Sequence, residues 1–487
     1  MTTLESQTPE AAQALQLLRQ NGARLVTIFG SLDDDGGTRV HYLVDINREY
    51  RMLSTRADGP ISSATRINPS AAWYERETSD QFGVEFAGHP DPRPLLFHEC
   101  WPAGAHPLAG IAGNPGEMRP EYRFVPVRGI GVCEVPVGPV HAGIIEPGHF
   151  RFSVVGDTVV HLELRHFYTH KGVEALFAGV PVERAVTLAE SVSGDNCFAH
   201  AVAYCQAVEN LCGATVPPRG QALRLIGLEL ERLMAHIADF GAMCGDVGFS
   251  LPTAYTARIK ESLLQASTRF FGTRCWRGLA TPGGMRRDLP VEAVKELARI
   301  VAAAEKDFAE MAAIALDAPS LLNRFQKTGI LGKQIAQELG TVGVVARASG
   351  LRHDVRHDHP YGQYRKLTVE VVSQTAGDAF ARARQRVAEA RVSAQLIAQT
   401  LGELPAGIVA TTIPATFDGE SFSAVESPRG ELLYWLRIKQ GRIARCHIKS
   451  PSFQNWPALP HAMKGNIIAD FPLVNKSFNL SYSGCDR

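Results

Sequence analysis

The chain has 487 residues, of which 45% are hydrophobic and 21% are charged. This length allows two or three domains with large buried cores, and the composition is ordinary for a globular protein. Its 50 basic and 50 acidic side chains balance, so no bulk attraction to nucleic acid or to anionic lipid is expected. No apolar run reaches the roughly 18 residues of a membrane span, and the start of the chain lacks the features of a signal peptide.

Nine cysteines are scattered along the chain, and none forms a C-x-x-C pair. Their odd number and wide spacing predict reduced thiols in a cytosolic compartment rather than a disulfide framework or a zinc site. A glycine-rich G-x-G-x-x-G turn after a strand is also missing from the sequence. We therefore expect no Rossmann-type NAD site in this chain.

The first predicted elements belong to a small α+β domain. Apolar residues at helical spacing indicate an amphipathic helix over residues 1–20. Residues 24–30 and 40–46 are rich in β-branched and aromatic side chains, which indicates two strands. Between them, Asp33-Asp-Asp-Gly-Gly37 is typical of a tight turn. This domain is predicted to cover residues 1–101.

A linker and a larger second domain are predicted to follow. Residues 102–119 have the proline and glycine content of a linker, and residues 120–487 form the second domain. An antiparallel sheet region is expected first, then the long helices of a bundle, then mixed strand and loop. The predicted strands and helices are 131–137, 148–155, 159–165, 222–244, 291–316 and 378–401. The predicted fold class is therefore α+β.

One motif in the N-terminal domain resembles a known family. Glu75-Arg-Glu-Thr-Ser-Asp80-Gln-Phe82-Gly, followed by Gly88-His-Pro-Asp91, is similar to the signature of the thirty-kilodalton subunit of respiratory complex I. The spacing is long and specific. In that family the domain is an assembly partner rather than a catalyst, so the resemblance implies an assembly role for residues 1–101.

A second resemblance covers residues 120–487. It is to the forty-nine-kilodalton subunit of complex I and to the large subunit of energy-converting NiFe hydrogenases. The matching pieces are Gly138-Pro-Val-His141, Glu146-Pro-Gly-His149, His170-Lys-Gly-Val-Glu174, Phe198-Ala-His200, Glu426-Ser-Pro-Arg429-Gly430 and Ser477–Arg487. The resemblance implies a fused subunit with a helical bundle of the hydrogenase-large-subunit type.

The chain departs from the hydrogenase pattern at the metal ligands. By the resemblance, the four thiolate positions fall on Ser193, Asn196, Ser481 and Gly484. Hydroxyl and amide groups are poor ligands for a soft nickel–iron centre, so nickel is not expected. Cys197 and Cys485 are each one place out of register, and such a slip turns the side chain away. The chain resembles the cysteine-lacking relatives of these hydrogenases.

The residues around these positions are the candidate site. The expected catalytic residues are His141, Asp195, Asn196, His200 and Arg429, and the expected headgroup-binding residues are His149, Ser193 and Ser481. An unpaired buried carboxylate is costly, so Asp195 needs a partner, and Arg429 is the predicted one. The alternative reading is that Asp195, Asn196 and His200 are hydrogen-bonded filler left after the metal was lost.

Glu146 and a histidine-rich segment could each suggest a metal site, but each has a simpler interpretation. Glu146 matches a magnesium-binding position of hydrogenases, and an ion pair with Arg487 is the expected replacement for the metal. His353, His357 and His359 have a spacing that could suit a metal. Because that stretch is highly charged and Pro360 follows it, a solvated or partner-facing loop is expected instead.

The resemblance implies a subunit of a membrane-associated oxidoreductase complex, peripheral on the cytosolic face of the inner membrane. Its partners would be an iron–sulfur small subunit that carries a 4Fe–4S cluster and membrane subunits that translocate ions. This chain would shape the cavity where electrons leave, and a quinone is the candidate acceptor. The alternatives are a non-catalytic scaffold that couples the other subunits, and a hydrogenase with unusual ligands.

Overall fold

The computed structural model describes residues 3–5, 11–20, 22–143 and 145–487. A four-stranded sheet opens the chain in the order β1-β4-β3-β2, with β1 (Thr3–Glu5), β4 (Glu49–Arg56), β3 (Thr38–Ile46) and β2 (Arg24–Leu32). Helices α1 (Ala11–Gln20) and α2 (Ala72–Phe82) complete this region.

The predicted strands and turn are confirmed in this region. The single helix predicted over residues 1–20 is wrong, since Thr3–Glu5 pairs with β4 as a parallel strand and the helix begins at Ala11. Residues 1–2 and 6–10 of that prediction lie outside the described residues.

The N-terminal sheet packs directly on the C-terminal sheet. That second sheet contains β14 (Gly419–Ser427), β15 (Gly430–Lys439) and β16 (Arg442–Lys449) in sequence order. The ring of Phe29 stacks on His447 at 4.3 Å and lies 4.9 Å from Trp435. Arg24 donates two hydrogen bonds to Glu431 at 2.7 and 2.8 Å. The two resembling regions therefore share a buried interface.

The segment predicted as a linker contains short elements. Strand β7 (Pro102–Ala103) pairs with β8 (Asn114–Met118), and a 3₁₀ turn, Pro107–Ala109, lies between them. This segment leads into the antiparallel meander, which is confirmed with the order β11-β10-β9. Its strands are β9 (Val132–Val137), β10 (His149–Val155) and β11 (Thr158–Arg165). The division at residues 101 and 120 stays a prediction.

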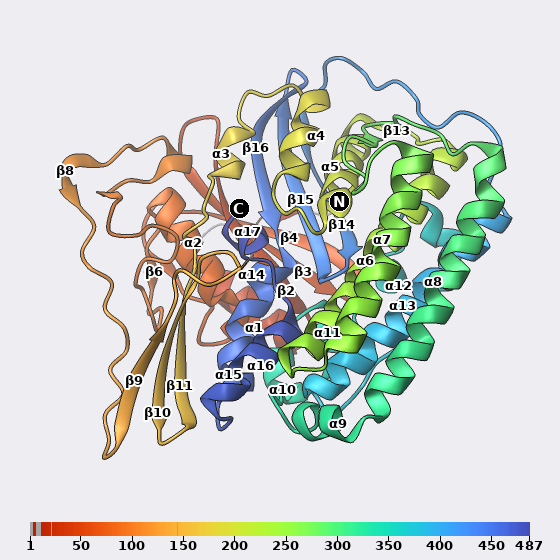
Figure 1. Ribbon diagram of the computed structural model, residues 1–487. Coiled ribbons are helices and arrows are strands. Elements are labelled where there is room, and N and C mark those ends of the chain that lie inside the picture. Colours follow the sequence, from red (N-terminus) through yellow and green to blue (C-terminus); the bar gives the residue numbers. More distant parts are fainter. Residues whose placement is uncertain (1–2, 6–10, 21, 144) are drawn as a thin grey trace.

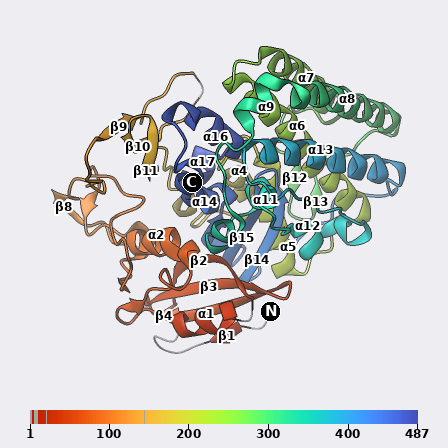
Figure 2. The ribbon, with the colours of Figure 1, turned by 90° about the horizontal axis from the view of Figure 1, so that it is seen from below.

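Long helices form the opposite side of the molecule. The three predicted helices are confirmed to within four residues at each end, and α7 adds a fourth: α6 (Pro218–Asp246), α7 (Ser250–Phe271), α8 (Val291–Asp317) and α13 (Ala379–Gly402). Figures 1 and 2 show α6 inside this bundle, with the meander and the N-terminal sheet outside it. Helix α6 is buried on almost every face, as expected for a central helix.

The C-terminal stretch is more helical than predicted. After β16, the chain forms short helices where loops were expected: α14 (Pro451–Asn455), α15 (Leu459–Met463), α16 (Phe471–Phe478) and α17 (Tyr482–Asp486). Each of these helices has only about one or two turns, which is too short for a helical period to be recognised in the sequence. Among the described residues, no helix is long and apolar enough to cross a membrane.

Candidate functional site

The two segments that resemble hydrogenase metal motifs meet in space. One precedes α5 (Cys197–Cys212), and the other is the turn between α16 and α17. The hydroxyl oxygens of Ser193 and Ser481 lie 2.9 Å apart although 288 residues separate them in sequence. A Cβ atom built on Gly484 would lie 3.0 Å from Ser481 and 3.5 Å from Ser193. Three of the four aligned positions are therefore in contact.

Local structure fixes Ser481 in this place. Its hydroxyl accepts a hydrogen bond of 2.9 Å from the Gly484 N–H and so caps the N-terminus of α17. Its own N–H donates to the Ser452 hydroxyl at 2.9 Å. Asn479, two residues before Ser481, has a φ of 49°. This left-handed conformation ends α16 and turns the chain toward Ser481.

Asp195 and Arg429 form the predicted ion pair. Arg429 Nη2 lies 2.6 Å from one oxygen of Asp195, and the Ser193 hydroxyl donates to the other oxygen. Arg429 Nε also donates to the Asn479 carbonyl at 2.6 Å. Burial opposes ionisation of Asp195, but the guanidinium and the hydroxyl outweigh it and hold its pKa below the usual value. The carboxylate is therefore ionised at neutral pH.

Three polar atoms at this site lack a partner among the described residues. They are Asn196 Oδ1, His200 Nε2 and Arg429 Nη1. His200 is fully buried, and burial lowers its pKa to about 3, so the ring is neutral. Its other nitrogen lies 2.7 Å from the hydroxyl of Tyr434. Buried polar groups are normally hydrogen-bonded, so each of these three atoms has unused capacity for a hydrogen bond to another molecule. We call Ser193, Asp195, Asn196, His200, Arg429 and Ser481 the polar site.

A nickel–iron centre does not fit the polar site. The aligned side chains are two hydroxyls, an amide and a glycine, which supply no thiolate. The hydroxyls of Ser193 and Ser481 lie 2.9 Å apart and can bond to each other. Cys197 donates to the Cys275 carbonyl at 3.0 Å, and burial raises the pKa of both Cys197 and Cys485. No group of three potential metal ligands occurs in the described part of the chain.

The loop before β10 approaches the C-terminal motif through Glu146. Its carboxylate accepts a hydrogen bond of 2.9 Å from the Ser483 N–H. The predicted Glu146–Arg487 ion pair is wrong, because Arg487 pairs with Glu77 and lies 3.4 Å from Glu174. Arg487 is drawn to these two carboxylates because they are buried between the two resembling regions, which sequence spacing cannot reveal.

His141 and His149 both form hydrogen bonds at the two ends of the loop that carries Glu146. His141 Nε2 lies 2.8 Å from the Gly148 carbonyl, and His149 Nδ1 lies 3.1 Å from the Gly138 carbonyl. Burial lowers the pKa of His149, and its Nε2 has no partner among the described residues. Each histidine thus has a structural hydrogen bond, and neither bonds directly to a residue of the polar site.

The solvated alternative for the histidine-rich segment is wrong for His353 and His359, which are partly buried, whereas His357 is exposed. The partner-facing alternative stays a prediction. His353 lies 2.9 Å from Asp358, and His359 lies 3.0 Å from Asp45 and stacks on Tyr50 at 3.9 Å. His353 is therefore paired within its own segment, and His359 is paired with the N-terminal sheet. The His359–Asp45 contact joins segments 314 residues apart and is invisible in the local sequence.

Sequence reasoning missed two carboxylates that support the polar site from α6. Glu231 accepts hydrogen bonds of 2.8 and 3.0 Å from the N–H groups of Phe198 and Ala199 at the start of α5, and burial raises its pKa to about 8. Asp239 accepts from the side chain of Asn479. The sequence carries no separate signal for them, because α6 has other charged side chains, such as Arg224 and Glu229, among its apolar ones.

Two family models match the chain. The model described as "Respiratory-chain NADH dehydrogenase, 30 Kd subunit" matches residues 4–110, and "Respiratory-chain NADH dehydrogenase, 49 Kd subunit" matches residues 246–417 and 409–487. Both models describe subunits of the respiratory-chain NADH dehydrogenase, so the chain is of the class of respiratory-complex subunits.

Curated relatives narrow this class. The chain is 31% identical to formate hydrogenlyase subunit 5 of Escherichia coli over 98% of this chain and 87% of that protein. It is 33% identical to hydrogenase-4 component G of Escherichia coli, over 87% and 75%. It is 29% identical to NADH-quinone oxidoreductase subunit 4 of Thermus thermophilus, over 73% and 94%. The chain belongs to the family of hydrogenase and complex I subunits, and it carries the matches to both family models in one polypeptide.

Proposed function

We propose that this chain is a subunit of a membrane-associated oxidoreductase complex and that its polar site binds the headgroup of a quinone-type electron acceptor without a nickel–iron centre. The observation that carries this proposal is the set of unpartnered atoms beside the Asp195–Arg429 pair. Side chains with a purely structural role would be expected to pair all their polar atoms, because a buried polar atom without a hydrogen bond costs about 1–3 kcal/mol of stability.

The polar site opens at the surface of this chain. The side chain of Asp195 is 37% exposed, whereas that of Arg429 is 9% exposed. The loop before β10 exposes Val140 to 83% and Ile145 to 44%. An exposed apolar loop beside an open polar site is typical of a surface buried against a neighbouring protein. A neighbouring subunit would complete the cavity and exclude water from it.

The side chains suit a carbonyl acceptor. Arg429 Nη1 is a free donor that would bond a quinone carbonyl, and the charge of Arg429 would stabilise the anion formed as electrons arrive. Asp195 holds the guanidinium in place through its other nitrogen. Neutral His200 would donate or accept through Nε2, depending on its tautomer. The electrons would come from outside this chain.

The proposed partners follow from the relatives. An iron–sulfur subunit with a 4Fe–4S cluster would face the polar site, and ion-translocating membrane subunits would anchor the complex. We propose that the chain lies peripherally on the cytosolic face of the inner membrane. No nucleic-acid partner is proposed, because the net charge is zero.

The test is quinone reduction by the purified intact complex. Arg429→Met should lower kcat/KM for the quinone by about 10- to 100-fold, as expected for a lost charged hydrogen bond. Asp470→Asn is the matched control, since Asp470 pairs with Arg324 at 3.1 Å outside the polar site. Equal quinone turnover in both variants would support the non-catalytic scaffold instead. Hydrogen turnover together with bound nickel would support a hydrogenase with unusual ligands.

A further inference from the structure

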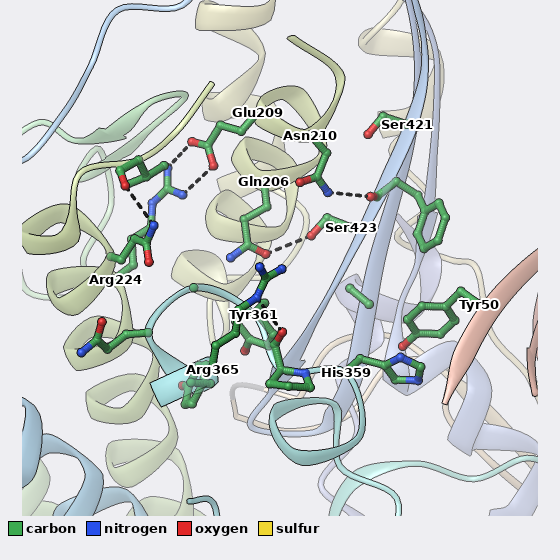
Figure 3. A pocket seen from close by; sticks show the side chains of 18 of the residues that line it. Tyr50, Gln206, Glu209, Asn210, Arg224, His359, Tyr361, Arg365, Ser421 and Ser423 are labelled. Carbon is green, nitrogen blue, oxygen red and sulfur yellow. Dashed lines mark hydrogen bonds and ion pairs between the residues drawn. The ribbon is translucent and has the colours of Figure 1, made fainter. Parts of the chain in front are cut away.

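A large groove lies away from the polar site, between the N-terminal sheet, α5, residues 358–365 and β14. This groove has a volume of about 1100 Å³ and is open to solvent. Figure 3 shows Tyr50 and His359 on one side and Gln206 and Asn210 of α5 on the other, with β14 behind. The proposed function uses none of these residues.

Strand β14 presents an open edge to this groove. Among the described strands it pairs only with β15, so it lies at one end of its sheet. The Phe422 carbonyl accepts a 3.1 Å hydrogen bond from Asn210, and the Glu426 N–H donates to Tyr361 at 3.2 Å, so these groups point away from β15. Backbone direction alternates along a strand, so Ala424, midway between them, points the same way.

The open edge has unused backbone groups. In the described part of the chain, the Phe422 N–H and both backbone groups of Ala424 make no hydrogen bond. Open edges of this kind accept an added strand, and proteins normally block them with charges, bulges or covering loops. No described strand or loop pairs with the edge between Glu420 and Ala424.

Two side chains indicate what the groove recognises. Gln363 is 8% exposed, lines the groove, and has no partner for Oε1 among the described residues. Arg365 is exposed and bonds only the Pro360 carbonyl, with no carboxylate within ion-pair distance in the described chain.

The acids of the groove wall are already paired. Each carboxylate that lines the groove has an arginine partner, in the pairs Glu49–Arg51, Glu209–Arg224, Asp358–Arg48 and Glu420–Arg437. The uncompensated charge is therefore the positive charge of Arg365.

We propose that this groove binds an extended segment of a partner subunit that adds to β14 as a fourth strand and places an acidic side chain on Arg365. A segment of about five residues would span Glu420–Ala424, at roughly 3.4 Å per residue. Its backbone would bond Phe422 and Ala424, and one of its N–H groups would donate to Gln363. Backbone pairing supplies affinity and the carboxylate supplies selection.

The test compares amide hydrogen exchange in the complex purified with its native partners and in the isolated chain. The amides of Phe422 and Ala424 should exchange at least about tenfold more slowly in the complex. A photo-crosslinker at Thr215, an exposed residue that lines the groove, should capture one segment that contains Asp or Glu. Arg365→Glu should remove both signals, while Arg258→Glu on α7 should keep them.

Several results would overturn the proposal. One is an unchanged amide exchange rate at Phe422 and Ala424 in an assembled complex. Another is a crosslink to a helix, to a segment without Asp or Glu, or to a second copy of this chain. A third is slowed exchange and crosslinking that persist in Arg365→Glu. The inference needs partner subunits but not quinone chemistry, so a complex that assembles without reducing quinone would defeat the proposed function and leave the groove proposal standing. A chain that has no partners at all would defeat both.

Discussion

Two polar regions of this molecule differ in how many of their polar atoms have hydrogen-bond partners. Around Arg347, all three guanidinium nitrogens bond, and they hold Glu389 and Glu426 at 2.8 Å. At the polar site, Arg429 keeps one nitrogen free, and Asn196 and His200 each keep one polar atom free. We call Arg347, Asp354, Glu389 and Glu426 the ion-pair cluster. A closed network of charges indicates a structural role, whereas an open one indicates a site that awaits another molecule.

The largest expected effect is on the ion-pair cluster. Arg347→Met should lower the free energy of unfolding by about 3–5 kcal/mol, because it leaves buried carboxylates unpaired. Chemical denaturation of the purified chain measures this. The control is Arg274→Ala, whose partner Glu261 is 43% exposed, and it should cost less than about 1 kcal/mol. Similar losses in both variants would contradict the structural role of the ion-pair cluster.

Arg429→Met should separate activity from stability. We expect kcat/KM for a quinone to fall by about 10- to 100-fold while the unfolding free energy falls by only about 1–3 kcal/mol, since part-exposed Asp195 can be hydrated. Steady-state assays and denaturation on the same preparation give both numbers. A variant that unfolds as severely as Arg347→Met would show that the two regions do not differ in kind.

Asp195→Asn should give a stability loss that depends on pH. Arg429 and Ser193 outweigh burial and lower the folded-state pKa of Asp195 below its usual 3.8, so the ionised form stabilises the fold. That contribution is complete above the unfolded-state pKa and is lost as pH falls through the folded-state value. Thermal unfolding should therefore show a lower Tm for the variant at pH 7 and a gap that narrows below pH 3.8. A gap that widens in acid would contradict the ion pair.

The smallest expected effect concerns the contact between the two motif segments. Ser193→Ala and Ser481→Ala should each cost about 1 kcal/mol, with a coupling of about 0.5–1 kcal/mol between them. A double-mutant cycle in denaturant measures the coupling. Strict additivity would mean that the 2.9 Å contact between the hydroxyls contributes nothing.

The sequence was sufficient for the parts of the molecule whose signals are local. Periodic apolar residues located α6, α8 and α13, and turn residues located the hairpin of β2 and β3. The Asp195–Arg429 pair was also predictable, because a carboxylate near a buried motif needs a cation and the matching motif supplies one. These inferences required only spacing, charge balance and the resemblance.

Contacts between distant segments were beyond sequence reasoning. The partners of Arg487 and His359 come from the N-terminal region, more than 300 residues away in the chain. The supporting carboxylates Glu231 and Asp239 lie on a helix whose apolar pattern hid them. Which polar atoms stay unpartnered depends on packing geometry, and no sequence pattern reports it.

The most direct test of the metal-free polar site is the nickel content of the purified complex, measured by elemental mass spectrometry. We expect no nickel bound to this chain, with iron only in a partner's cluster, because the four aligned positions supply no thiolate. One nickel per chain that is lost on replacing Cys197 or Cys485 would contradict a metal-free site.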